Sequence, residues 1–86
     1  MPYIKQNQRA HFDCAIEEII DTLGPDWNAG DLNYIVSKIT WSLFKKNARY
    51  ATANTLIGAL ECIKLELYRR QISPYEDQKI IENGDL

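Results

Sequence analysis

Apolar residues recur at steps of three and four along most of this chain, and no segment alternates apolar with polar residues. The first pattern is typical of amphipathic helices and the second of half-buried strands, so the chain is predicted to be all-α. We expect three main helices, over residues 7–23, 28–46 and 50–70, and a short C-terminal helix from residue 73. With 86 residues in all, the chain has room for one small helical domain, residues 1–86.

Residues that end or cap helices delimit the first two helices. Gly24 can adopt the left-handed conformation that ends a helix, and the proline after it cannot continue one. Asn28 has a side chain that caps a helix N-terminus, and Asp31 stands three residues later, as in a capping box. Asn47 suits a left-handed stop after the second helix.

A helix–turn–helix corner is predicted where the third helix ends. Arg69 and Arg70 close that helix, where the helix dipole favours cations. Ser73, followed by proline and then by Glu76, is typical of the start of a new helix. At such a corner the arginines, with Tyr68 and Tyr75 nearby, would form a fork that grips an anionic ligand. The alternative is that they pair with the acidic residues just beyond.

The second helix has an unusual face opposite its apolar stripe. At 100° per residue, this side carries Tyr34, Lys38, Trp41 and Lys45, whereas a surface helix of a monomer should be polar there. One interpretation is a platform on which a base stacks while the lysines bind phosphate. The other is a second buried face, in which the two aromatic rings pack against another subunit. The two interpretations are compatible at a subunit boundary.

The third helix also has two apolar sides. Its main stripe is made by Ala53, Leu56, Leu60, Ile63 and Leu67. Its reverse face, which we define as Ala51, Gly58, Cys62 and Leu65, is predicted to contact another backbone, because glycine inside a helix costs about 1 kcal/mol relative to alanine. An internal contact with the first or second helix is the alternative. Two helices with two apolar faces each exceed what an 86-residue monomer can bury, so we expect a homo-oligomer.

Nothing in the residue pattern points to catalysis. The chain has one histidine, His11, no nucleophile–histidine pairing at a supporting spacing, and no glycine-rich phosphate loop. His11 and Cys14 could supply two metal ligands, but a zinc site needs three or four. We therefore expect no enzyme, no metal and no cofactor, and two reduced thiols, Cys14 and Cys62, in a cytoplasmic protein. No segment approaches the roughly 20 apolar residues of a membrane span.

Charge is distributed unevenly along the chain. Residues 1–37 carry a net charge of −4, residues 38–70 carry +5, and residues 71–86 carry −3. The basic middle segment can pair with the acidic flanks or attract phosphate. The pI of about 5.3 argues against general binding to duplex DNA, which usually requires a strongly basic face.

Short motifs spread over nearly the whole chain resemble a family of small proteins of unknown function found in bacteriophage and prokaryotic genomes. They are MPYIK (residues 1–5), GDLNYI (30–35), LE (60–61), KLELYRR (64–70), PYED (74–77), KI (79–80) and ENGD (82–85). The resemblance implies a phage-type origin, hence a host cytoplasm, and a helical fold, but no catalytic or binding residues. In outline the predicted fold is also similar to phage proteins that sequester cyclic nucleotide signals of bacterial immunity, which is an analogy of fold only.

These observations favour a non-enzymatic, homo-oligomeric binding protein. The leading hypothesis is sequestration of an anionic, nucleotide-like signal as a counter-defence, with the ligand held by Tyr34, Lys38, Trp41, Lys45, Arg69, Arg70 and Tyr75. The alternative is a protein-interaction module that inhibits or scaffolds a host or viral protein. A small helical DNA-binding regulator is a third, less favoured hypothesis. The expected subunit interface comprises Tyr34, Trp41, Ala51, Gly58 and Leu65.

Overall fold

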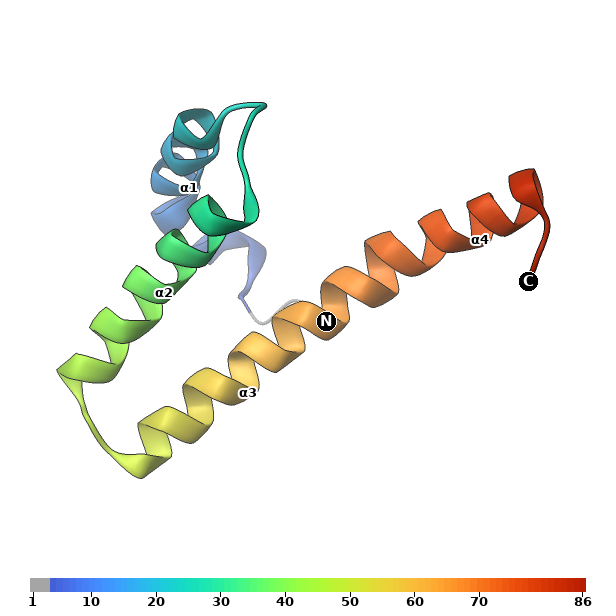
Figure 1. Ribbon diagram of the computed structural model, residues 1–86. Helices are drawn as coiled ribbons and strands as arrows, with labels where there is room; N and C mark the ends of the chain where they lie inside the picture. Colours follow the sequence, from blue (N-terminus) through green and yellow to red (C-terminus); the bar gives the residue numbers. More distant parts are fainter. Residues whose placement is uncertain (1–3) are drawn as a thin grey trace. The chain divides into compact units, whose positions relative to one another are not determined.

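The computed structural model describes residues 4–86, and over these residues every regular element is helical (Figure 1). The all-α prediction is therefore confirmed. The chain divides into two units, Met1–Ser42 and Leu43–Leu86, which are described separately. The elements are a 3₁₀ turn η1 (Gln6–Gln8), the α-helices α1 (Ala10–Leu23), α2 (Ala29–Lys46) and α3 (Tyr50–Leu67), a π-helical turn η2 (Tyr68–Ile72) and the helix α4 (Ser73–Asn83).

The first unit begins with η1, so α1 starts three residues later than predicted. The helix ends where predicted. Gly24 has a φ of 66°, a left-handed value that costs glycine little, and its amide donates to the Ile20 carbonyl at 3.1 Å. The chain then turns away from the axis of α1 toward the start of α2.

Asn28 and Asp31 form a reciprocal capping box at the start of α2, as predicted. The Asp31 amide donates to Asn28 Oδ1 at 2.9 Å, and the Asn28 amide donates to Asp31 Oδ2 at 3.2 Å. Each bond satisfies a backbone donor that has no partner within the helix. The start of α2 is thus determined by two side chains three residues apart.

Replacing Asn28 by alanine is expected to lower the free energy of unfolding by about 1 kcal/mol, because the Asp31 amide loses its acceptor. Chemical denaturation followed by circular dichroism, at one fixed chain concentration, measures the change. Asn54→Ala is the matched control, since Asn54 is exposed on α3 and its side chain bonds to no residue of 4–86. Equal losses in the two variants would contradict the capping role.

The helix α2 ends at Lys46, as predicted, but Asn47 does not end it in the predicted way. Over the described residues only glycines have a positive φ, so the prediction that Asn47 ends α2 in a left-handed conformation is wrong. The Asn47 amide donates to the Phe44 carbonyl at 3.1 Å, and the Arg49 amide donates to the Asn47 carbonyl at 2.9 Å. These tight turns bring the chain into α3 without a left-handed residue.

In the second unit α3, η2 and α4 form one continuous helix of 34 residues, residues 50–83 (Figure 1). At 1.5 Å per residue its length is about 51 Å. The predicted corner and the separate short helix are therefore wrong. Ser73 has helical dihedral angles, φ −60° and ψ −46°, and no side chain caps the start of α4.

The π-helical turn explains why the helix continues past Pro74. A proline inside an α-helix lacks the amide hydrogen and its ring clashes with the carbonyl four residues earlier. A π turn takes one extra residue, which widens the backbone at that carbonyl and makes room for the ring. Glu76, expected to complete a capping box with Ser73, instead accepts a hydrogen bond from the Tyr68 hydroxyl.

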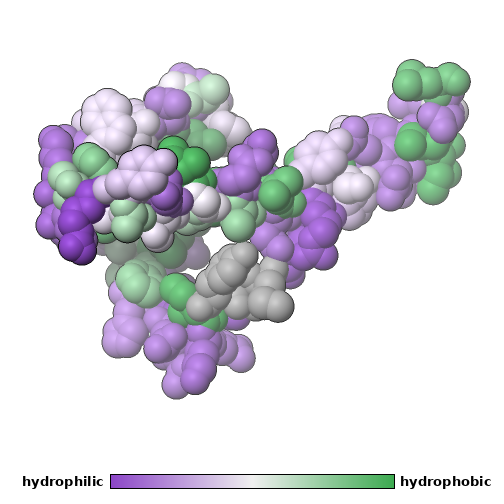
Figure 2. Space-filling model, turned by 90° about the horizontal axis from the view of Figure 1, so that it is seen from below, coloured by the Kyte–Doolittle hydropathy of each residue, from purple (hydrophilic) through white to green (hydrophobic). Residues whose placement is uncertain are grey.

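None of residues 4–86 is buried, so the described part of the chain contains no hydrophobic core. Large apolar side chains such as Phe12 and Ile20 in the first unit, and Ile63 and Leu67 in the second, are half exposed or more. Figure 2 shows hydrophobic residues, in green, at the surface, including the α4 end of the chain at the right of the view. Among residues 4–86 no helix is long and apolar enough to cross a membrane.

Candidate binding surfaces

One face of α2 carries the two aromatic and two basic side chains predicted to bind a ligand or another subunit. Tyr34, Lys38, Trp41 and Lys45 follow at steps of four, three and four, and we call this face the aromatic–lysine row. Tyr34 and Trp41 are each 65% exposed. Both lysines are exposed and form no ion pair with any residue of 4–86. The row can therefore stack on a base beside its phosphates or pack against a protein.

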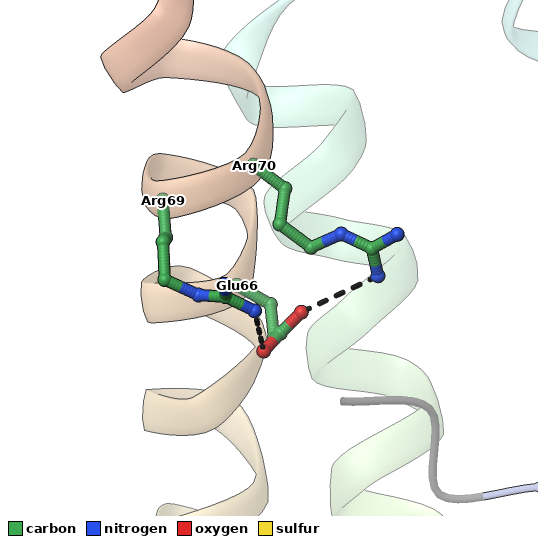
Figure 3. Close-up of polar contacts among 3 residues, drawn as sticks. All are labelled: Glu66, Arg69 and Arg70. Carbon is green, nitrogen blue, oxygen red and sulfur yellow. Dashed lines mark hydrogen bonds and ion pairs between the residues drawn. The ribbon is translucent and has the colours of Figure 1, made fainter.

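The arginine pair is already engaged within its own helix. Arg69 Nη2 lies 3.0 Å from Glu66 Oε1, and Arg70 Nη1 lies 3.5 Å from Glu66 Oε2, so the two guanidinium groups share one carboxylate (Figure 3). Hydrogen bonds from cationic groups, that of Arg69 among them, hold the pKa of Glu66 well below its usual value. An anionic ligand would compete with Glu66 for these donors.

Tyr75 lies one to two turns beyond the arginine pair and is 59% exposed. The Lys79 ammonium lies 5.6 Å from the centre of its ring, which is a cation–π distance. Tyr68 lies about two turns before Tyr75, and its hydroxyl donates a hydrogen bond to the Glu76 carboxylate. This hydrogen bond and the negative charge of the carboxylate raise the pKa of Tyr68. The residues predicted to form a fork at a corner therefore follow one another along a continuous helix.

The reverse face of α3 is open. Leu65 is 56% exposed, Ala51 is exposed as well, and a Cβ built on Gly58 would meet no heavy atom within 4 Å. The predicted close approach of a second backbone at Gly58 is thus not made within the described residues. The position leaves room for another helix.

A groove between the end of α1 and the start of α2 was not predicted. Ile19, Leu23 and Ile35 line it with apolar groups, Glu18 and Asp31 line it with carboxylates, and Tyr34 of the aromatic–lysine row lines it as well. The groove is open to solvent, and its two carboxylates repel an anion. The sequence signal for it was the short connection after Gly24, which returns the chain close to α1.

Cys14 and Cys62 are free and exposed. Among residues 4–86 no three histidine, cysteine or acidic side chains lie close enough to hold a metal ion. The expectation that the purified chain binds no zinc stays a prediction, which elemental analysis measures.

The fold and its surfaces define a small all-α protein made of amphipathic helices with exposed apolar and charged faces. The chain belongs to the family DUF6899, a domain of unknown function, whose family model matches residues 1–86. This confirms the resemblance to an uncharacterised family that spans the chain, whereas the phage origin stays a prediction. The first three residues of the MPYIK segment lie outside the described residues. Neither a curated protein nor a solved structure matches the chain.

Proposed function

We propose that this chain is a non-enzymatic helical interaction module that assembles with copies of itself and presents apolar faces to protein partners. The observation that carries the proposal is that none of residues 4–86 is buried, although the helices carry apolar stripes. A folded domain of this size buries about 60% of the surface that its unfolded chain exposes. Exposed apolar faces of this extent mark sites of protein association.

Sedimentation velocity of the full chain over a range of micromolar concentrations tests the proposal. We expect an oligomer, and a midpoint of thermal unfolding that rises with chain concentration, because assembly stabilises only the folded state. A monomer that unfolds cooperatively, at a temperature independent of concentration, would contradict it.

A second candidate function, sequestration of an anionic nucleotide-like signal as a phage counter-defence, is supported by the aromatic–lysine row. Its lysines have no ion-pair partner among residues 4–86, and its aromatic rings are open to solvent. Stacking contributes about 1–3 kcal/mol per base, and a charge-assisted hydrogen bond about 1.5–3 kcal/mol. One contact of each kind contributes about 2.5–6 kcal/mol of the roughly 8 kcal/mol that a micromolar dissociation constant requires, and further stacking and phosphate contacts along the row can add to it.

Calorimetry with a panel of cyclic di- and trinucleotides and ADP-ribose tests this second function. We expect at least one micromolar ligand, bound about tenfold or more weakly by Lys38→Ala because a phosphate contact is lost. Lys64→Ala is the control, since Lys64 is an exposed α3 lysine that pairs with Glu61 at 2.9 Å. Absence of heat with every member of the panel leaves the interaction module as the proposed function.

A further inference from the structure

A row of apolar side chains on α3 has the spacing of a coiled-coil seam. Its steps alternate between three and four, as between the a and d positions of a heptad. Ile63 is 62% exposed and Leu67 is 54% exposed, while the three earlier members of the row, Ala53, Leu56 and Leu60, are half-buried. We define the α3 seam as Ala53, Leu56, Leu60, Ile63 and Leu67. We infer that a second copy of this chain packs along the α3 seam with its own α3 antiparallel, an inference that rests on the self-assembly proposed above.

The second unit does not itself supply a partner for the seam. Besides the last residues of α2, Leu43–Leu86 contains only the one continuous helix. The reverse face of α3 is apolar as well and lies on the opposite side of the helix. A helix that is apolar on two sides needs a neighbour on each. A second copy offers a seam of the same length and spacing, and the two copies form a closed symmetric dimer.

The π-helical turn extends the seam beyond α3. After Leu67 a regular heptad would continue with Arg70 and Pro74, neither of which suits an apolar seam. Because η2 takes one extra residue, the same side of the helix continues instead with Gln71 and Tyr75. The extra residue thus takes Arg70 and Pro74 off the side of the seam and brings the Tyr75 ring onto it.

Charge selects the antiparallel orientation. Lys45, Lys46 and Arg49 lie at the start of the second unit and form no ion pair with residues 4–86, whereas residues 71–86 carry a net charge of −3. Parallel copies would bring the basic ends together and the acidic ends together. Antiparallel copies bring each acidic end alongside a basic end, which is electrostatically complementary.

The residues of the α3 seam give the register. In an antiparallel pair an a position faces a d position, so Leu56 faces Leu67 of the second copy and Leu60 faces Ile63. In this register Tyr50 of one copy is level with Ser73 of the other, so the acidic end of each copy extends past the start of the other's α3, where Lys45, Lys46 and Arg49 lie.

Two charge-reversal variants test the orientation. Glu76→Lys with Asp77→Lys makes both ends of the pair basic, and Lys45→Glu with Lys46→Glu makes both ends acidic. We expect each variant alone to self-associate about tenfold or more weakly than the wild type. An equimolar mixture should recover the affinity, because a mixed pair has opposite charges at both ends. Native mass spectrometry measures the mixed species directly.

Cysteine cross-linking tests the register in chains that also carry Cys14→Ser and Cys62→Ser. Leu56→Cys and Leu67→Cys face each other only in the antiparallel pair, where their Cα atoms come within the disulfide range of about 4.4–6.8 Å. We expect mild oxidation to link a mixture of the two chains and to leave each chain alone unlinked. A parallel pair would instead link Leu56→Cys to itself.

The two proposals fail in different ways. A monomeric wild type would overturn both the self-assembly and the antiparallel pair. A wild type that assembles, with self-linked Leu56→Cys chains or with charge-reversal variants whose mixture does not recover, would overturn the antiparallel pair alone.

Discussion

Replacing Leu60 by alanine is expected to lower the free energy of unfolding of the assembled protein by about 2–4 kcal/mol per chain. Leu60 lies in the middle of the α3 seam, where truncation leaves a gap on both sides of the symmetric pair. A helix that loses its packed face also loses helicity, because tertiary contacts supply most of its stability. Chemical denaturation at fixed chain concentration, followed by far-ultraviolet circular dichroism, measures the loss.

Glu61→Ala is the matched control for Leu60→Ala. Glu61 is the next residue on α3 and forms an exposed ion pair with Lys64. Exposed pairs of this kind contribute at most about 1 kcal/mol. Similar decreases in the free energy of unfolding would show that the seam contributes no more to stability than the side of the helix that carries Glu61.

Trp41→Glu is expected to weaken self-association by about 30-fold or more, or to unfold the chain, if the aromatic–lysine row lies between subunits. A tryptophan at the centre of an interface typically contributes 2 kcal/mol or more, and a carboxylate in its place is desolvated without a partner. Trp41 is 65% exposed in the single chain, so the substitution costs little in an unassembled chain. Sedimentation velocity measures the dissociation.

Trp41→Phe is the control, because it keeps an aromatic ring on the same face of α2 and is expected to assemble. A Trp41→Glu protein that assembles like the wild type would exclude the row from the interface. If that protein also loses a nucleotide that the wild type binds, the row serves the ligand instead.

Local signals predicted the helices well where the interacting residues are close in the sequence. Asn28 and Asp31 stand three residues apart, and their reciprocal hydrogen bonds form within the first turn of α2. Gly24 ends α1 through its own left-handed conformation. Each of these features depends on a few consecutive residues, so pattern and propensity were sufficient.

The same kind of reasoning failed after Arg70. Ser73 and Glu76 have the spacing of a capping box, and proline suits the first turn of a helix. The alternative, a π-helical turn that carries the helix past the proline, accompanies a hydrogen bond between Tyr68 and Glu76, eight residues apart. A pattern of a few neighbouring residues does not reveal this hydrogen bond. The bond engages the Glu76 carboxylate, which therefore does not cap the helix.

The candidate binding surfaces also include one feature that the sequence predicted and one that it did not. Helical periodicity alone places Tyr34, Lys38, Trp41 and Lys45 on one face of α2, because they share one element. The expectation that Arg69 and Arg70 pair with the acidic residues beyond them assumed a corner after Arg70; in the continuous helix Glu66, three and four residues earlier, pairs with both arginines.

The amino-acid sequence alone was sufficient for the helical class, the start of α2, the ends of α1 and α2, and the excess of apolar faces, all of which follow from the spacing of neighbouring residues. The three-dimensional structure was needed to show that residues 50–83 form one helix and that no residue of 4–86 is buried. Periodicity tells which side of a helix is apolar, but what covers that side depends on contacts between elements far apart in the sequence or in different molecules.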